Sequence, residues 1–524
     1  MRLRVFKNFV IAVVAAYPLM YFGMFAGDAE IHLKYGENAA RGLFFEYNAG
    51  EKAAGVTSPG YMLFLSVLFK FAPERVIPIL VVILNYIGWY LLVYLTYRLL
   101  KQVASNPVLI LAGTLVAGLL PGSAYNSVVG MENVFFGDLV SILICLASKW
   151  NFLDFDARAF NARVTAWRGV LFGLIAGISF WVRPEGLPFL GLLGLYSAFV
   201  ARRKNAYRAL VIAASPACVI SFAFLLLLAY FHHRLSGRLL PGSAQSRMIM
   251  GTVDALQLGP IPITLKFAGR LAEYFPLTLL ALAGIGASLR STMNGENRPG
   301  LFYSLVFAAF FILYSTFLGS AHLARYTIFL MPLVVILAVI GLESAMEWRA
   351  TLSHRGQCAF RISLTAMTVF LALVFSIETR IRLGMASHQE MLSAMEAPQR
   401  RKAVSDELMR QLGGPPAPVS LAYVEVQMRY FLDDRFIIRS LDGRTDPVML
   451  KHYRNGIYDH IGYIKERRVQ YLMELPNFNR DRQVWSLERL RALKSGASLE
   501  RDGVVFTKLD FGDAVRVTLA GQAR

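Results

Sequence analysis

Charged side chains are scarce in this sequence. Asp, Glu, Lys and Arg make up 17% of its 524 residues, whereas soluble domains average about 25%. Cysteine is rarer still: Cys145, Cys218 and Cys358 lie far apart and form no CxxC pair. The composition therefore argues against a soluble globular chain, and the cysteine spacing excludes a disulfide framework.

Apolar residues are correspondingly abundant, with 56% of the chain hydrophobic and a mean hydropathy of +0.47. They form long runs, most of which reach the roughly 20 helical residues that cross a bilayer once their flanks are counted. Because backbone groups in lipid need hydrogen-bond partners within the segment, such spans are helical. The sequence predicts a polytopic α-helical membrane protein with about eleven spans, at residues 9–26, 76–97, 107–120, 134–148, 169–182, 187–200, 209–231, 271–289, 301–318, 326–343 and 362–377.

Basic residues outnumber acidic ones, 54 to 35, which gives a formal net charge of +19. They gather in short loops between the apolar runs, so we expect them to anchor the cytoplasmic side and expect no nucleic-acid partner. The N-terminus places Arg2, Arg4 and Lys7 before a long apolar run, which is typical of an uncleaved signal anchor. These patterns predict a multi-pass protein of a bacterial inner membrane with a cytoplasmic N-terminus.

One apolar segment, Gly60–Phe71, is too short to cross and is bounded by Pro59 and Pro73. If it crossed, the later basic loops would face outward, against the positive-inside rule. If it lies in the interface as an amphipathic helix, those loops face the cytoplasm. We therefore expect an interfacial helix within a first outer loop at 27–75, and a C-terminus on the periplasmic side.

The composition changes after about residue 380. Residues 385–524 are rich in charge, are broken by Pro and Gly, and contain no span. The runs VSLAYVEV, RFIIRSL and VQYLMEL are typical of strands, and residues 390–412 and 485–494 are typical of helices. We expect two domains: a transmembrane domain at 1–380, which includes the first outer loop, and a periplasmic α/β domain at 385–524.

Ionisable residues stand at the ends of several spans, where they are costly and are functional candidates by default. With the orientation above, their loops meet at the outer face of the membrane. We expect a polar pocket at the lipid–water boundary that contains Asp28, Glu30, Glu132, Arg183, Glu185, Arg247, His322 and Arg325. A further acid, Asp138, lies inside a predicted span and either pairs with a neighbouring helix or lines this pocket.

Such a pocket suits a sugar carried on a polyprenyl phosphate, whose tail stays in the bilayer while its phosphate lies just above. Arginines hold a phosphate in bidentate fashion, and a carboxylate, Asp28 or Glu132, serves as general base on the acceptor hydroxyl. Asp28 and Glu30 also offer oxygen ligands for a divalent cation (Mg²⁺, Mn²⁺ or Ca²⁺), although an arginine clamp needs no ion. No organic cofactor is expected.

These residues also have structural interpretations. Asp28 and Glu132 stand where helix N-caps are found, and residues 183–186 fit a plain turn fixed by a proline. Arg247 and Arg325 fit interface anchors, whose long side chains reach the headgroups.

A series of short motifs follows the same order as these loops. The later ones are GME at 130–132, RPEG at 183–186, a Pro-Gly-Ser turn at 241–243 before Arg247, Arg325-Tyr326 with Pro332, and SLDGRTD at 440–446. The first outer loop contributes Asp28, Ala29, Ile31, Tyr35, Asn38, Gly42, Tyr47, Asn48, Gly50, Glu51, Gly55, Thr57, Ser58 and Pro59. Over most of the chain this pattern resembles a bacterial branch of the GT-C glycosyltransferase superfamily that includes mycobacterial terminal arabinofuranosyltransferases.

The resemblance implies an inverting transferase that uses a polyprenyl-phosphate sugar, with Asp28 as base and with His32 and Tyr35 among the donor-binding residues. It also implies a periplasmic glycan, lipid or protein as acceptor. The loop departs from the family pattern where a paired acid is expected, because Gly27 precedes Asp28; Glu30 restores a carboxylate at a position usually held by Tyr.

Two other functions are alternatives. A transporter or flippase of lipid-linked sugars tends to have inverted repeats and midplane sites in broken helices, and the sequence has no repeat and places its acids at one face. A non-catalytic scaffold would gain little from a costly polar cluster at the membrane. The sequence therefore favours the transferase.

Overall fold

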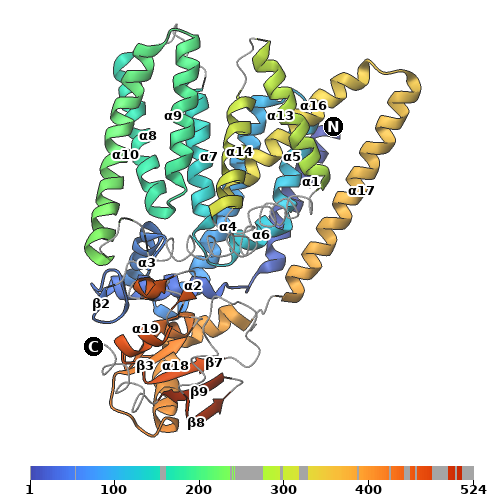
Figure 1. Cartoon of the computed structure of the whole chain (residues 1–524). Helices are drawn as coiled ribbons and strands as arrows, with labels where there is room; N and C mark the ends of the chain where they lie inside the picture. Colours follow the sequence, from blue (N-terminus) through green and yellow to red (C-terminus); the bar gives the residue numbers. More distant parts are fainter. Residues whose placement is uncertain are drawn as a thin grey trace. The chain divides into compact units, whose positions relative to one another are not determined.

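The computed structural model describes residues 2–52, 55–153, 161–236, 239, 241, 275–294, 299–317, 328–385, 389–423, 426–441, 449–454, 457–458, 460–474, 494–501 and 504–509. By its internal contacts the chain divides into two compact units (Figure 1). The helical unit comprises residues 1–26, 79–228 and 254–391, and the mixed unit comprises residues 27–78, 229–253 and 392–524.

Each predicted apolar run coincides with a helix of the structure (Figure 1). These helices are α1 (Arg2–Ala16), α4 (Ile77–Val103), α5 (Pro107–Leu119), α7 (Asn133–Lys149), α8 (Ala162–Val182), α9 (Gly186–Arg203), α10 (Tyr207–Ser236), α13 (Phe275–Met293), α14 (Gly300–Phe317), α16 (Met331–Ala350) and α17 (His354–Met385). Shorter helices stand between them: η1 (Tyr17–Tyr21), α6 (Pro121–Val128) and η4 (Ile328–Leu330).

The polytopic helical fold is therefore confirmed. By length and composition, 6 of the described helices are able to cross a membrane, or 7 if α5 and α6, bent by 56° at their junction, form one broken span. The predicted total of about eleven spans stays a prediction.

The mixed unit begins with residues 27–78, which form α2 (Gly27–Ala40), a hairpin of β1 (Glu46–Asn48) and β2 (Glu51–Lys52), α3 (Pro59–Phe71) and η2 (Glu74–Val76). The short apolar segment that we expected to be helical is α3. Helix α2 packs on it at Gly36, where an added Cβ would lie 2.6 Å from the Cβ of Leu65. A larger side chain at this position would force the two helices apart.

The C-terminal segment continues the mixed unit with α18 (Gln389–Gln411), β3 (Val419–Tyr423), η5 (Val426–Phe431), β4 (Phe436–Ser440), η6 (Met449–His452), β5 (Tyr453–Arg454), β6 (Ile457–Tyr458), α19 (His460–Glu466), β7 (Tyr471–Glu474), β8 (Lys494–Arg501) and β9 (Val504–Leu509). Five strands form one sheet in the order β4-β3-β7-β9-β8. Strand β3 is parallel to both its neighbours, and the β7, β9 and β8 pairs are antiparallel.

Three of these strands, β3, β4 and β7, coincide with the predicted apolar runs, and α18 coincides with the helix predicted at 390–412. The helix predicted at 485–494 lies outside the described residues except for Lys494, which begins β8.

The loop at residues 27–78 and the C-terminal segment share one hydrophobic core. Tyr35, Phe45 and Tyr47 of the loop are buried with Val419 of β3 and Phe436 of β4. In addition, the Asn48 amide donates to the carbonyl oxygen of Ile438 (3.0 Å) and accepts from its N–H (3.1 Å), which satisfies the edge of strand β4. We expected the loop to belong to the transmembrane domain that ends near residue 380. In the structure the loop instead groups with the C-terminal segment, because its aromatic residues are buried against the sheet.

Candidate functional site

In the helical unit, a short loop presents Glu132 at the start of α7. Gly130 in this loop has φ +85°, and an added Cβ would lie 2.5 Å from the ring of Phe25. The Asn85 amide of α4 donates to the carbonyl oxygens of Ser127 (2.9 Å) and Met131 (2.6 Å). A glycine-dependent turn and a buried amide therefore fix the backbone on both sides of Gly130.

Glu132 is paired with the RPEG segment between α8 and α9. The Arg183 guanidinium lies 3.2 Å from the Glu132 carboxylate and binds both carboxylate oxygens of Glu185, at 2.6 Å and 3.2 Å. It also donates to the amide oxygen of Asn133. Burial acts to lower the pKa of Arg183, but the charges of Glu185 and Glu132 outweigh it and raise that pKa. We call this cluster the RPEG cluster.

The RPEG cluster decides two of the structural alternatives. Glu132 occupies the N-cap position of α7 but makes no capping hydrogen bond through its side chain, so the capping interpretation is wrong. The turn at 183–186 is present, because the N–H of Gly186 donates to the carbonyl oxygen of Arg183 at 3.1 Å. The same turn also contains the buried guanidinium of Arg183, which binds the carboxylates of both Glu132 and Glu185.

Asp138 lies on α7, six residues after Glu132, and is 5% exposed. It faces α4, since a Cβ added at Gly88 would lie 3.2 Å from its carboxylate oxygen. The two alternatives for Asp138, pairing with a neighbouring helix and lining the pocket, both stay predictions.

In the mixed unit, α2 carries the predicted base. Asp28 lies half-buried in the first turn of this helix, where the helix dipole favours a carboxylate. From Glu30 to Ala39 every residue except Ile31 is buried, although this stretch contains several charged or polar side chains: Glu30, His32, Lys34, Glu37 and Asn38. An ordinary surface helix keeps such groups in water, and burying them is costly unless they are paired.

The predicted donor-binding residues of α2 lie among aromatic rings. His32 makes an edge-to-face contact with Tyr61, with ring centroids 5.3 Å apart, and the rings of Tyr35 and Tyr47 are 5.1 Å apart. Burial raises the pKa of Tyr47; Arg429 opposes that rise, and the charges of Tyr35, Glu30 and Asp28 add to it. Both acids are thus near enough to Tyr47 to influence its ionisation.

Sequence reasoning missed an ion network on the same helix. Glu37 accepts from Arg41 (2.6 Å) and from Arg401 of α18 (2.7 Å), and lies 3.4 Å from the Lys34 ammonium. Arg401 also donates to the carbonyl oxygen of Tyr430 at 2.7 Å and stacks on that ring at 4.8 Å. Burial lowers the pKa of Lys34 to about 7, and the nearby charge of Arg429 acts in the same direction.

That Asp28 and Glu30 hold a divalent cation stays a prediction. Because α2 is helical from Gly27, these residues are two positions apart and project from different faces of the helix. Within the ranges that the structure describes, no group of three or more His, Cys, Asp or Glu side chains is arranged to hold a metal ion.

The predicted residues fall into separate groups. Glu132, Arg183 and Glu185 come together in the helical unit, and Asp28, Glu30, His32 and Tyr35 share α2 in the mixed unit. Arg247, His322 and Arg325 lie outside the described residues. That all of them line one pocket stays a prediction.

Comparison with known proteins gives a likeness of fold. No protein-family model matches the chain, and no curated protein matches its sequence. Among solved structures, the chain is similar to ArnT from Cupriavidus metallidurans, with a TM-score of 0.50, 14% identity, and coverage of 96% of this chain and 97% of that one. It is also similar to the archaeal oligosaccharyltransferase AglB from Archaeoglobus fulgidus in complex with an inhibitory peptide and a dolichol-phosphate. There the TM-score is 0.50, the identity 13%, and the coverage 89% and 69%.

These similarities extend over nearly the whole chain, and both neighbours have the GT-C fold that the motifs predicted. The likeness to the mycobacterial branch in particular stays a prediction. The chain is a multi-pass membrane protein with a GT-C-like fold.

Proposed function

We propose that this protein is a glycosyltransferase that moves a single sugar from a polyprenyl-phosphate donor to a periplasmic glycan, lipid or protein. The observation that carries the proposal is helix α2, which directly follows the first membrane helix and buries charged and polar side chains along most of its length. Such burial is costly; Lys34 and Glu37 belong to the ion network that packs α2 on α18, and we assign Asp28, Glu30, His32 and Tyr35 to the reaction. The GT-C-like fold supports the same class of reaction.

In this proposal Asp28 is the general base. Its carboxylate takes the proton of the acceptor hydroxyl while the hydroxyl oxygen attacks the anomeric carbon of the donor. The bond from that carbon to the phosphate oxygen breaks, and polyprenyl phosphate leaves with the electron pair. The anomeric configuration is inverted because a single displacement occurs. A positioned base of this kind contributes about 10²–10⁴ in rate.

The other residues position the donor. Glu30, His32 and Tyr35 share α2 with Asp28, and we assign them to the sugar or its phosphate. Arg183, which is itself paired with Glu185, binds the Glu132 carboxylate, and we assign Glu132 as the second catalytic carboxylate. Arg247, His322 and Arg325 are proposed as further donor-binding groups. No step of the proposed reaction depends on a divalent cation held by Asp28 and Glu30.

The location follows from the charge pattern. We place the protein in a bacterial inner membrane with a cytoplasmic N-terminus, so that α2 and the C-terminal segment face the periplasm. A donor with a polyprenyl tail is then available in the bilayer.

The test compares the envelope glycans of a deletion strain with those of its parent by mass spectrometry, after complementation with variants. Wild type and Asp406→Asn, which removes an exposed carboxylate of α18, are expected to restore the parental glycans. Asp28→Asn is expected to be expressed equally and to restore none. Restoration by Asp28→Asn would remove this residue from the mechanism, and lipid-sugar flipping in proteoliposomes without a glycosidic product would favour the transporter alternative.

A further inference from the structure

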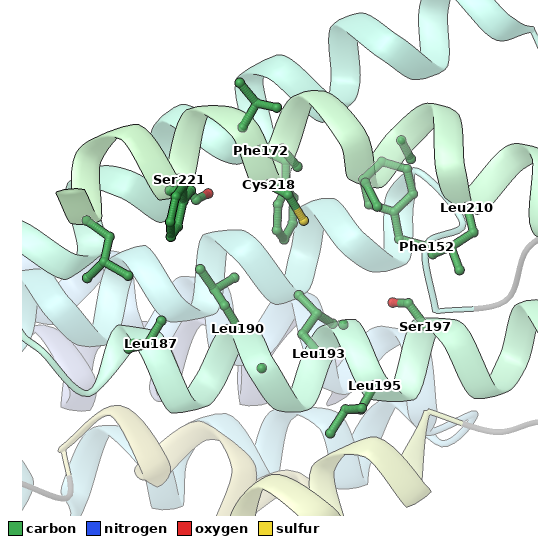
Figure 2. Close-up of a pocket in the computed structure, with 18 of the residues that line it drawn as sticks. Phe152, Phe172, Leu187, Leu190, Leu193, Leu195, Ser197, Leu210, Cys218 and Ser221 are labelled. Carbon is green, nitrogen blue, oxygen red and sulfur yellow. The ribbon is translucent and has the colours of Figure 1, made fainter.

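The helical unit contains an apolar groove that the proposed reaction does not use. It has a volume of about 860 Å³ and lies along α9 and α10, with Phe172 and Phe180 of α8 and Phe152 completing its lining. Figure 2 shows Leu187, Leu190 and Leu193 following one another along α9, opposite Ser221 and Cys218 of α10. This volume lies within the range of about 300–1,000 Å³ that is usual for ligand sites. We call it the apolar groove.

The sequence explains why the groove is open. Helix α8 packs closely on α10, because Gly169, Gly173 and Gly177 each face α10 where an added Cβ would overlap its atoms. Helix α9 also has glycines, but a Cβ at Gly191 or Gly194 would meet nothing within 4 Å, and both residues line the groove. Small residues therefore close the contact between α8 and α10 and leave space beside α9.

One end of the groove is strongly basic. Arg202 and Arg203 end α9, Lys204 follows them, and Arg208 is the second residue of α10; all four are exposed. Leu210, two residues after Arg208, lines the groove. We call Arg202, Arg203, Lys204 and Arg208 the basic rim.

The same end has the aromatic residues of a membrane interface. Because α8, α9 and α10 run alternately up and down side by side, the start of α8 lies at the end of the unit that carries the basic rim (Figure 1). There Trp150, Arg163, Trp167 and Arg168 line a second cavity of about 350 Å³. The ring of Trp150 contacts that of Phe152, which lines the apolar groove. Tryptophan and basic side chains together mark the headgroup level of a bilayer.

We propose that the apolar groove and the basic rim form a binding site for an anionic phospholipid. The acyl chains lie along α9 and α10, where the lining offers hydrocarbon and almost no hydrogen-bonding groups. The phosphate and its negative headgroup lie at the basic rim, where Arg202, Arg203 and Arg208 are exposed. By the positive-inside rule this site belongs to the cytoplasmic leaflet.

The test measures lipid retention by the full-length protein, purified in detergent with equal amounts of phosphatidylglycerol and phosphatidylcholine, by native mass spectrometry. Wild type is expected to retain phosphatidylglycerol preferentially. Replacing Arg202, Arg203 and Lys204 by Gln is expected to weaken phosphatidylglycerol binding roughly hundredfold, at about fivefold per charge. Gly191→Leu with Gly194→Leu fills the groove without a clash and is expected to abolish retention.

The control is Gly286→Leu on α13, where an added Cβ also meets nothing within 4 Å but no groove residue is changed. It is expected to retain phosphatidylglycerol as wild type does. Equal retention of the two lipids by wild type, or normal retention by the filled variant, would overturn the proposal. Displacement of phosphatidylglycerol by added polyprenyl phosphate would instead assign the groove to a donor tail and would also overturn it.

Discussion

Arg401 is the residue through which the C-terminal segment holds helix α2, and its removal gives the sharpest test of that packing. In Arg401→Met, Glu37 loses its 2.7 Å partner from α18, and the hydrogen bond to the Tyr430 carbonyl oxygen is lost as well. Breaking a buried ion pair costs about 3–5 kcal/mol. Because Glu37 keeps Arg41 and Lys34, we expect the low end of that range, about 3 kcal/mol.

The assay is hydrogen exchange of the α2 amides, read by mass spectrometry on the protein in detergent. A loss of about 3 kcal/mol in local opening free energy should accelerate exchange in α2 roughly hundredfold. The matched control is Arg400→Met, the neighbouring arginine, which pairs with Glu396 on the surface with 70% of its side chain exposed. Such exposed pairs contribute about 0–1 kcal/mol, so the control should barely change the exchange rate. If Arg401→Met exchanged no faster than Arg400→Met, the ion pair would not hold α2.

Three further predictions test a buried ionisable group, a pair of buried hydrogen bonds and a glycine with positive φ. Burial lowers the pKa of Lys34 to about 7 from its ordinary 10.5, so the unfolded chain binds this proton more tightly and stability should rise with pH between those values. Lys34→Met should therefore flatten the pH dependence of the thermal-unfolding midpoint, and an unchanged slope would contradict the assignment. Asn85→Leu removes two hydrogen bonds to backbone carbonyl oxygens, so the free energy of unfolding should fall by about 2 kcal/mol and the thermal-unfolding midpoint should fall with it. An unchanged midpoint would show that these two hydrogen bonds do not hold the loop. Gly130→Ala combines a positive φ with overlap on Phe25, whereas Gly50→Ala at φ +82° meets open space, so the first should lower the midpoint further than the second. Equal losses would mean that the Phe25 contact is not restrictive.

Local patterns in the sequence predicted the elements of the fold well. The apolar runs all became helices, and VSLAYVEV, RFIIRSL and VQYLMEL all contain strands, because hydropathy and residue type act over a few neighbouring residues. The RPEG cluster was partly anticipated. Glu132 and Arg183 stand at the ends of successive spans, so a membrane orientation alone suffices to bring them to one level.

The burial of the charged side chains of α2 could not be predicted from the sequence. Lys34, Glu37 and Arg41 have the spacing of ordinary surface ion pairs on a helix, which predicts solvent exposure. Their burial depends on Arg401, which is 364 residues from Glu37 and belongs to a segment that the composition assigned to another domain. A single sequence offers no local pattern that pairs such distant residues.

The most direct test of the account uses the lipids of a deletion strain. We expect that strain to accumulate a polyprenyl-phosphate-linked sugar, and we expect the purified wild-type protein, given an acceptor fraction from the same strain, to release polyprenyl phosphate from it. Mass spectrometry of the lipid before and after incubation should show the loss of one sugar with wild type, and a rate reduced by about 10²–10⁴ with Asp28→Asn. Conversion at the wild-type rate by Asp28→Asn, or an unchanged lipid with the wild-type protein, would contradict the account.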